Sequence, residues 1–556
     1  MKKPKTTQEN TNKSKKIKDP LYGYINIPTD IFDNIINTPE FQRLKNIRQT
    51  SYESLYPNAL HNRFVHSLGV YYLATLAANS FFGELNSVIT TKKLESKLDC
   101  QKIQQIQQIF ELAALLHDIG HAPFSHTLED RYKDAFKSYI NNDYYDYKQI
   151  DALIIEKQGY TNNSEFSPAP HEQMSCIVCL QIFKDQIDDQ YIDFFLRCIL
   201  GIQYYSLKEN DYEKIIMNWC IQMLNCDTID VDRLDYVMRD CYFSGYNNVN
   251  IDYKRFLESM HCHIDKDNYL MFSYNQRCIT EIEKIFVAFE SEKKWVQHHN
   301  TIIYENFILE NIVNLIDKDK KLFCYEALTQ QGIQLSNANS IRLLSDSDIL
   351  FLIKQKYDFS VNKEQPEYFI AEYFDRNKRR TPLWKTESEF KVLFRLQQKE
   401  CRNSQSNDMY QHNMALLLKS NCQIINETAL ADLQSTSNKD KQNITKAISI
   451  LQKIKECIQK YSCIDFDLAI AKDKPHTPNY YKIQKTDIYI QKTDTIYPFQ
   501  ELSSVINSED KNQLQSNNSQ NVYFIYARKR DNCDKQKVKQ EIDNLAKDMI
   551  DILTEG

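Results

Sequence analysis

The stretch Leu112-Ala-Ala-Leu-Leu-His-Asp-Ile-Gly-His-Ala-Pro-Phe-Ser-His126 decides the fold, because an apolar run ends in a cluster of polar side chains. The apolar spacing that begins at Ile103 predicts a helix over 103–116. His117 and His121 are four residues apart, so they share one helical face, and Asp118 can reach the same helix end. Imidazole with carboxylate suits Mn, Fe, Zn or Co better than Ca. The stretch therefore predicts a helix that delivers ligands to a transition-metal ion.

A second segment, His61-Asn-Arg-Phe-Val-His66, lies at the start of a helix predicted over 64–82. Arg63 precedes His66 by three residues on the same helical face, which suits a phosphate-binding guanidinium beside a metal ligand. A single histidine at a helix end is more often a cap or a core residue. Six of the 12 histidines lie between residues 61 and 171, however, and this density favours a site.

A third helix is predicted over 230–239, where Asp232, Tyr236 and Asp240 repeat every four residues. We select Asp232 as a further metal ligand. The remaining acidic residues, Asp227, Asp230 and Asp235, are interpreted as a solvated helix face.

Composition narrows the class of protein. The chain has 556 residues, of which 42% are hydrophobic and 12% aromatic, so it should fold around more than one core. A net charge of -6 selects no partner, and nucleic acid has no specific support. No apolar run approaches the roughly 20 residues of a membrane helix, so no membrane association is expected. Scattered cysteines without a signal peptide predict a cytoplasmic protein, or a nuclear one in a eukaryote.

The chain divides into three predicted parts. A lysine-rich disordered tail covers 1–18, a helical domain 19–330, and a C-terminal lobe for regulation and oligomerisation 331–556. In this lobe, alternating runs at 480–490 and 522–526 predict strands. The spacing of Val538, Ile542, Leu545, Met549 and Ile552 predicts an amphipathic helix, whose apolar stripe serves its own lobe or a subunit interface. The fold class is therefore mostly α, a helical bundle with a C-terminal mixed α/β lobe.

Five segments over about residues 19–305 resemble, in order, the HD-domain superfamily. The likeness is greater to the deoxynucleoside triphosphate triphosphohydrolases, which include bacterial dGTPases and the vertebrate SAM-and-HD-domain enzyme. The segments are Asp19-Pro-Leu-Tyr-Gly, Thr38-Pro-Glu-Phe-Gln-Arg-Leu, His61-Asn-Arg-Phe-Val-His-Ser-Leu-Gly-Val, His117-Asp-Ile-Gly-His-Ala-Pro-Phe-Ser-His and Asp230-Val-Asp-Arg-Leu-Asp-Tyr.

The resemblance implies an HD-domain bundle that cleaves a dNTP to a deoxynucleoside and inorganic triphosphate. Its metal ion, Mn, Fe, Zn or Co, would activate water beside the α-phosphate, with Mg on the nucleotide phosphates. The implied metal ligands are His66, His117, Asp118 and Asp232. His126 would be the general acid, oriented by Glu129, while His121 and His171 would contact the phosphates.

The implied substrate contacts are spread over several segments. Gln49 would face the nucleoside, Arg63 and Arg233 the phosphates, and Tyr236 and Asp240 the ribose 3′-hydroxyl. Further substrate contacts are implied for Gln297 and His298, in the segment Lys293-Lys-Trp-Val-Gln-His298.

Several residues depart from the family pattern. Asn37 replaces the aspartate that reads guanine at an activating site, Val296 replaces a tyrosine, and Thr50-Ser-Tyr-Glu-Ser replaces a glycine-rich turn beside the substrate base. Base preference therefore does not transfer. Arg380-Thr-Pro-Leu-Trp-Lys385 resembles a regulatory segment, so we expect an allosteric nucleotide and a homo-oligomer.

Two other functions stay open. The same ion could serve a phosphodiesterase or nucleotidase that acts on another phosphoester. Alternatively, the chain could be a nucleotide sensor with negligible turnover.

Overall fold

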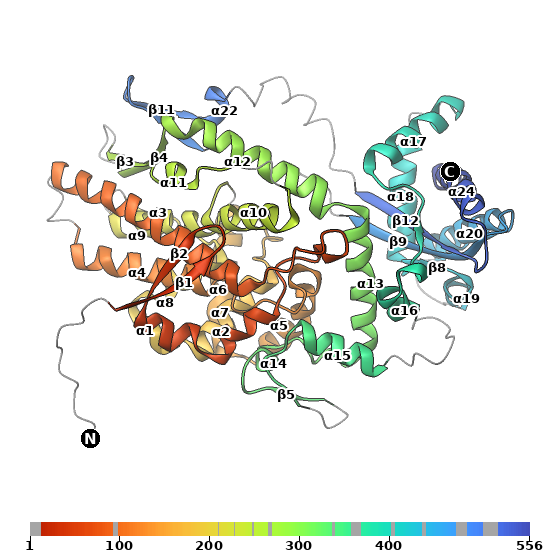
Figure 1. Cartoon of the computed structure of the whole chain (residues 1–556), viewed down its shortest axis with the longest axis horizontal. Coiled ribbons are helices and arrows are strands. Elements are labelled where there is room, and N and C mark those ends of the chain that lie inside the picture. The colour runs from red at the N-terminus through yellow and green to blue at the C-terminus, as the bar shows by residue number, and fades with distance from the viewer. Residues whose placement is uncertain are drawn as a thin grey trace. The chain divides into compact units, whose positions relative to one another are not determined.

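The computed structural model describes residues 13–92, 98–208, 211–226, 228–246, 250–264, 270–335, 340–356, 368–401, 406–435, 441–473, 486–503 and 521–555. The predicted mostly α class is confirmed. The chain forms two compact units (Figure 1). Unit 1 comprises residues 1–292, 316–356 and 478–508, and unit 2 comprises 293–315, 357–477 and 509–556. The sequence suggested that the helical domain ends at residue 330 and the C-terminal lobe begins there, whereas the chain crosses between the units repeatedly.

Three long helices form the centre of unit 1: α3 (Arg63–Lys92), α4 (Cys100–Leu116) and α10 (Val231–Ser244). They confirm the three helices predicted from apolar spacing. Helix α3 packs against α4, the next helix along the chain, and against α10, which is distant in the sequence (Figure 1). Asp99 caps α4 by accepting a hydrogen bond from Gln101 N at 2.8 Å, and the helix is buried from Leu112 to Leu116. Its C-terminal end therefore delivers His117 into the core.

The other helices of unit 1 surround this centre. Helix α4 also packs against α8 and α9, and α7 packs against α5, α6 and α8. Their bounds are α1 Thr29–Ile31, α2 Pro39–Arg43, α5 Tyr132–Asn141, α6 Tyr145–Thr161, α7 Pro170–Ile182, α8 Ile192–Leu200, α9 Tyr212–Leu224, α11 Tyr253–Leu257, α12 Ile279–Glu292, α14 Tyr325–Leu328, α15 Asp346–Lys356 and α22 Phe499–Leu502.

An N-terminal hairpin replaces part of the predicted tail. Strand β1 (Ser14–Asp19) pairs antiparallel with β2 (Gly23–Pro28). The prediction of a tail over 1–18 is therefore wrong for residues 14–18, while residues 1–12 lie outside the described part of the chain. The lysine side chains of β1 stay at the surface. The hairpin contributes Ile25 and Ile27 of β2 to the hydrophobic core, where they are 1% and 0% exposed.

A four-stranded sheet explains why a late segment belongs to unit 1. Its strand order is β11 (Thr495–Pro498), β10 (Asp487–Ile490), β4 (Leu270–Asn275) and β3 (Met260–Ile264). Strand β10 runs parallel to β4, with Ile488 opposite Tyr274. It confirms part of the strand predicted at 480–490, of which residues 480–485 lie outside the described chain. Two short strands, β5 (Ile333–Gln334) and β6 (Ser340–Ile341), form a separate pair.

Unit 2 contains the predicted mixture of helix and sheet. Its sheet has the order β7 (Thr381–Pro382), β12 (Val522–Lys529), β9 (Ile464–Asp473) and β8 (Ile424–Ile425), and β12 confirms the strand predicted at 522–526. The helices are α13 Asn300–Ile316, α16 Tyr368–Phe374, α17 Glu387–Cys401, α18 Ser406–Lys419, α19 Glu427–Ser435, α20 Lys441–Ile458 and α24 Lys535–Thr554.

The closing amphipathic helix is α24. Ile542, Leu545 and Met549 are buried where α24 packs against α18 and α20, so the stripe serves its own unit. The segment that resembled a regulatory site also belongs to the core of unit 2. Arg380 is 3% exposed and contacts Glu372 at 2.5 Å and Asp467 at 2.8 Å. Two carboxylates engage this guanidinium, and a role of the segment toward a nucleotide stays a prediction.

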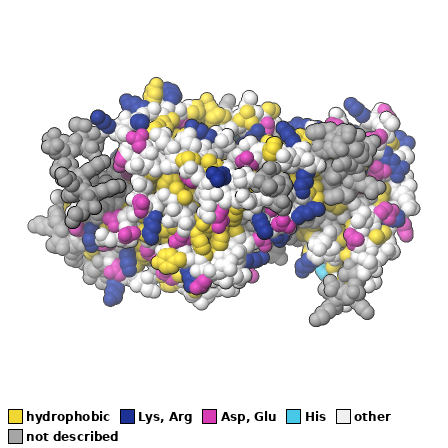
Figure 2. Space-filling model, turned by 90° about the horizontal axis from the view of Figure 1, so that it is seen from below, with side chains coloured by type: hydrophobic (Ala, Val, Ile, Leu, Met, Phe, Trp, Pro, Cys, Tyr) yellow, Lys and Arg dark blue, Asp and Glu magenta, His cyan; other side chains and the backbone are white. Residues whose placement is uncertain are grey.

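The described surface gives little support for a binding partner whose charges are all of one sign. On the face drawn in Figure 2, the described Lys, Arg, Asp and Glu side chains are interspersed rather than gathered into one broad patch. Within the described ranges, none of the helices has both the length and the apolar character needed to cross a bilayer.

Candidate metal centre

Three of the predicted metal ligands meet in unit 1. His66 comes from the first turn of α3, His117 follows the last residue of α4, and Asp118 comes next; one ligand atom of each lies within 4.8 Å of the others. Asp232, in the first turn of α10, brings its Oδ1 to 2.9 Å from His66 Nε2 and 3.6 Å from His117 Nε2. The fold thus brings together all four predicted ligands.

The ring nitrogens at this centre fit a cation. Nε2 of His66 and of His117 are buried and make no hydrogen bond, although carboxylate oxygens lie nearby. A buried polar atom left unpaired costs about 1–3 kcal/mol, so these nitrogens call for a partner that the described protein atoms do not supply. Imidazole and carboxylate together suit Mn, Fe, Zn or Co, and the donor set does not select among them.

The other nitrogen of each histidine is held by the protein. Nδ1 of His117 contacts the backbone oxygen of Ala114 at 2.9 Å, and Nδ1 of His66 lies 2.7 Å from Asp235 Oδ2. Such contacts fix the tautomer that leaves Nε2 for a metal. Burial lowers the pKa of His66, but Asp232, Asp235 and Asp118 together raise it to about 9.

Asp235 corrects one sequence interpretation, because it is 0% exposed rather than solvated. It accepts hydrogen bonds from Tyr22 Oη at 2.6 Å and from Arg239 Nε at 2.8 Å. The α3 backbone passes this pair at Gly69, where a Cβ atom would lie 2.0 Å from Asp235 Oδ1. The face of α10 that the sequence suggested to be solvated thus supplies a buried carboxylate, Asp235, that contacts the candidate metal ligand His66.

Asp230 is also buried, at 4% exposed, which again contradicts the predicted solvated face. It caps α10 by accepting hydrogen bonds from Arg233 N at 2.8 Å and Cys226 N at 3.0 Å. Asp227 lies outside the described residues.

Arg63 does not extend toward an open phosphate site. It is 3% exposed, and its guanidinium donates to Asp118 Oδ2 at 2.7 Å, Ser125 Oγ at 2.9 Å and Gln49 O at 3.3 Å. All three of its guanidinium nitrogens therefore contact protein. Burial raises the pKa of Asp118, but Arg63, His117 and His121 hold it well below its usual range. The structure shows Arg63 as a residue that positions Asp118, and a phosphate would have to share its donors.

A second histidine cluster adjoins the first. One ligand atom each of His121, His126 and His171 lies within 4.8 Å of the others, and His121 Nε2 is 3.2 Å from Asp118 Oδ1. The rings of His121 and His171 stack with centroids 4.1 Å apart. Glu129 bridges the other two members, with Oε1 3.2 Å from His126 Nδ1 and Oε2 2.5 Å from His171 Nδ1.

The charges of this cluster follow from its contacts. Burial lowers the pKa of His171, but Glu129 raises it to about 9. Burial and Arg63 instead hold the pKa of His121 well below its ordinary value. Two stacked imidazoles therefore differ in charge near neutral pH. The side chain of His126 is 63% exposed, so it can meet a ligand from solvent.

The turn that carries His126 is held from a distant segment. Phe124 and Ser125 have positive φ of 57° and 51°. Asp346 Oδ1 accepts a hydrogen bond from Phe124 N at 2.7 Å, and its Oδ2 accepts one from Arg48 N at 2.9 Å. Nothing in the sequence marked Asp346, because its partners lie more than 200 residues away.

Apart from Arg63, the predicted substrate residues lie in three parts of the chain. They are Gln49 before α3, then Arg233, Tyr236 and Asp240 on α10, and Gln297 and His298 in unit 2. Gln49 is 5% exposed with an unpaired Oε1, and Asp240 is paired with His61, which the sequence reasoning did not select. Arg233 donates to Thr228 O at 3.3 Å, and the Tyr236 ring lies 6.2 Å from that of Phe289.

The third group, Gln297 and His298, belongs to unit 2, where His298 Nδ1 lies 2.7 Å from Asp473 Oδ2. Their roles toward a substrate stay predictions.

Comparison with known proteins agrees with this geometry. Residues 63–157 match the family model of the HD domain, a range that includes His66, the His117-Asp118 doublet, His126 and Glu129. The chain is 31% identical over 260 residues to the deoxynucleoside triphosphate triphosphohydrolase SAMHD1 of Danio rerio. It is 28% identical over 328 residues to an uncharacterized homologue of MG461 from Mycoplasma pneumoniae.

These alignments are partial. The first covers 46% of this chain and 37% of the relative, and the second covers 57% and 65%. A phosphohydrolase structure from Bacteroides thetaiotaomicron shares the fold, with a TM-score of 0.51 and 20% identity over 93% of this chain and 100% of that one.

Proposed function

We propose that this chain, which carries an HD domain over residues 63–157, is a dNTP triphosphohydrolase that releases a deoxynucleoside and inorganic triphosphate. The proposal rests on one observation, that the metal-ligand cluster and the second histidine cluster adjoin at Asp118. Asp118 belongs to the metal-ligand set and also lies 3.2 Å from His121 of the second cluster. An ion site and a set of oriented imidazoles are therefore available to one substrate. The likeness to SAMHD1 proteins supports a dNTP as that substrate.

The metal would be held by His66, His117, Asp118 and Asp232. When bound, it would polarise a phosphoryl oxygen and favour deprotonation of water. His126 is the general acid of the proposal, since its ring is exposed to a ligand from solvent while Glu129 holds its Nδ1. His171, with its pKa raised to about 9, supplies positive charge for the phosphates. His121 stays neutral beside it and can offer one N–H.

The test is product identification. Purified full-length protein is incubated with each dNTP in Mn or Mg, and the phosphate product is separated by ion exchange. Triphosphate together with a deoxynucleoside is the expected result. Pyrophosphate or single phosphate would contradict the proposal, as would cleavage of a cyclic dinucleotide or RNA without cleavage of any dNTP.

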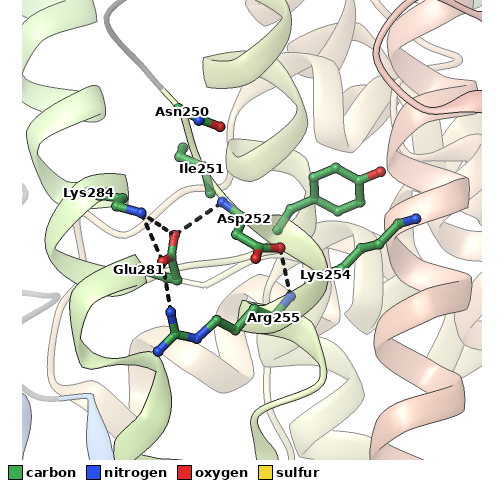
Figure 3. Close-up of a pocket in the computed structure, with 8 residues that line it drawn as sticks. Asn250, Ile251, Asp252, Lys254, Arg255, Glu281 and Lys284 are labelled. Carbon is green, nitrogen blue, oxygen red and sulfur yellow. Dashed lines mark hydrogen bonds and ion pairs between the residues drawn. The ribbon is translucent and has the colours of Figure 1, made fainter.

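We also propose a regulatory nucleotide site at a pocket of unit 1. Three cationic and two acidic side chains line it, among the residues Asn250, Ile251, Asp252, Tyr253, Lys254, Arg255, Glu281 and Lys284. Glu281 is 1% exposed and lies 2.9 Å from Lys284 Nζ and 3.6 Å from Arg255 Nη1. Figure 3 shows these groups converging on Glu281, whereas Lys254 points away from it. A nucleotide phosphate would compete with Glu281 for the two cations.

Titration with GTP and each dNTP tests this second site. Lys284→Ala should weaken activation by a nucleotide, and Lys391→Ala serves as the control because Lys391 is an exposed lysine of unit 2 that pairs with Glu387. Equal activation of the wild type and of Lys284→Ala would contradict the assignment.

A further inference from the structure

The turn that carries His126 is bound by a short segment that lies far along the chain. Asp346 is 6% exposed; its Oδ1 accepts a hydrogen bond from Phe124 N at 2.7 Å, and its Oδ2 accepts one from Arg48 N at 2.9 Å. Burial raises the pKa of Asp346 to about 6, and both hydrogen bonds act against that rise. The carboxylate is therefore ionised at neutral pH, and each of its oxygens accepts from one backbone N–H.

The backbone of this turn needs external support. Phe124 and Ser125 are consecutive residues with φ of 57° and 51°, in the left-handed region that side chains other than Gly, Asn and Asp rarely adopt. Two such residues in a row persist only where the surrounding contacts hold them. His126 follows directly in the sequence, so the place of its ring depends on this conformation.

The same contacts reach a candidate metal ligand through Ser125. Its Oγ donates to Arg48 O at 2.5 Å and accepts a hydrogen bond from Arg63 Nε at 2.9 Å. Arg63 in turn donates to Asp118 Oδ2 at 2.7 Å. Asp346 thus holds the N–H of Arg48 while Ser125 holds its C=O. A shift of the turn would therefore also move the guanidinium that orients Asp118.

The segment that carries Asp346 also contacts the turn at Ile119–His121. Arg43 is 3% exposed, and its Nη1 donates to Leu344 O at 2.9 Å. Its Nη2 donates to Ile119 O at 2.8 Å and to His121 O at 3.0 Å. One short segment outside the HD-domain match therefore binds both turns of the candidate site.

We infer that Asp346 is a positioning residue of this site: it fixes the turn at Phe124 and Ser125, and thereby the place of His126. His126 is the general acid in the proposed function, on which this inference rests. Asp346 acts through the backbone N–H groups that it binds, and the candidate metal ligands stand on or next to α3, α4 and α10. Its loss should therefore lower kcat while KM and bound metal change little.

Two substitutions of Asp346 grade the effect, and a neighbouring aspartate provides the control. Asp346→Asn keeps the shape of the side chain and one acceptor oxygen, whereas Asp346→Ala removes both acceptors. Asp348→Asn removes the same charge from the same turn of α15, where Asp348 accepts hydrogen bonds from Ser345 N and Oγ. Full-length protein is assayed for kcat and KM on each dNTP and for bound metal. Thermal melting checks the fold, and mass spectrometry follows hydrogen exchange at residues 119–128.

We expect kcat to fall by about tenfold in Asp346→Asn and by about 100-fold in Asp346→Ala, with KM and bound metal within about twofold of the wild type. Hydrogen exchange at residues 119–128 should be faster in both variants and unchanged in Asp348→Asn. Adding Ser125→Ala to Asp346→Asn should cost little more than the larger single loss, because both side chains hold one turn. An equal fall of kcat in Asp348→Asn would overturn the inference, as would additive losses in the double variant.

Two further results separate this inference from the proposed function. If the wild type hydrolyses dNTPs and Asp346→Ala keeps its kcat, the proposed function stands and the inference fails. If the wild type cleaves only another phosphoester and Asp346→Ala loses kcat on that substrate, the inference stands and the proposed substrate fails. A wild type that cleaves no phosphoester overturns both.

Discussion

Nδ1 of His171 lies 2.5 Å from Oε2 of Glu129, and the other oxygen of the same carboxylate faces His126. One buried anion thus orients an exposed imidazole and keeps a buried one protonated. Burial raises the pKa of Glu129, but His126 and His171 lower it far below the usual range, so it stays ionised. The arrangement makes Glu129 the group on which both histidines depend.

Replacing Glu129 by Gln should therefore reduce turnover while sparing the metal site. We expect kcat to fall by about 100-fold or more, because a general acid without its orienting carboxylate is misplaced. Metal content, measured by mass spectrometry, should not change. Asp130→Asn is the matched control, since Asp130 is exposed and pairs with Lys133 at the surface. Equal losses in both variants would argue against a specific role for Glu129.

The contact between His171 and Glu129 should make the free energy of unfolding depend on pH. The pKa of His171 is raised in the folded chain from 6.5 to about 9. A raised histidine pKa adds stability that is fully present below about pH 6.5 and is lost as the pH rises through about 9. Urea unfolding of the wild type and Glu129→Gln at about pH 6, 8 and 10 measures this difference. A gap between the two proteins that widens toward high pH would contradict the assignment.

Gly69→Ala should disturb the support of His66. The added Cβ would lie 2.0 Å from Asp235 Oδ1 and 2.4 Å from Arg239 Nη2, so the buried pair must move. We expect a loss of about 1–3 kcal/mol in unfolding free energy together with weaker metal binding. Gly83→Ala on the same helix meets nothing within 4 Å and should be neutral or slightly stabilising. Similar melting temperatures for both variants would show that α3 does not approach α10 this closely.

Removal of the metal should abolish hydrolysis reversibly. Chelator-treated protein should lose activity and regain it with Mn, Fe, Co or Zn, and His117→Ala should retain little bound metal because one of four donors is missing. His412→Ala, which removes an exposed histidine of unit 2, should bind metal like the wild type. Full activity in demonstrably metal-free protein would rule out a metal-dependent reaction.

Local spacing was enough to predict the helices and to mark His117 and Asp118 as candidate ligands, whereas the full set of four candidate ligands followed from the resemblance to a known family. An apolar run ending at Leu116 must place His117 and Asp118 at the edge of a core, and His66 follows the same logic at the start of α3. These inferences need only the 3.6-residue helical period. Spacing could not predict the interleaved units, because pairing of β10 with β4 joins segments about 200 residues apart.

By itself, the sequence determined which side chains could bind a metal and on which helices they stand. Only the tertiary structure decided which carboxylates support them. Asp230, Asp232 and Asp235 look alike along α10, and the packing of α3 at Gly69 buries Asp235 against His66, while the cap of α10 buries Asp230. In the same way Arg63 is engaged by Asp118, and His61 by Asp240. The physical reason is that a buried charge needs a compensating partner, and for Asp235, Arg63 and His61 that partner comes from a segment that only the folded chain brings near.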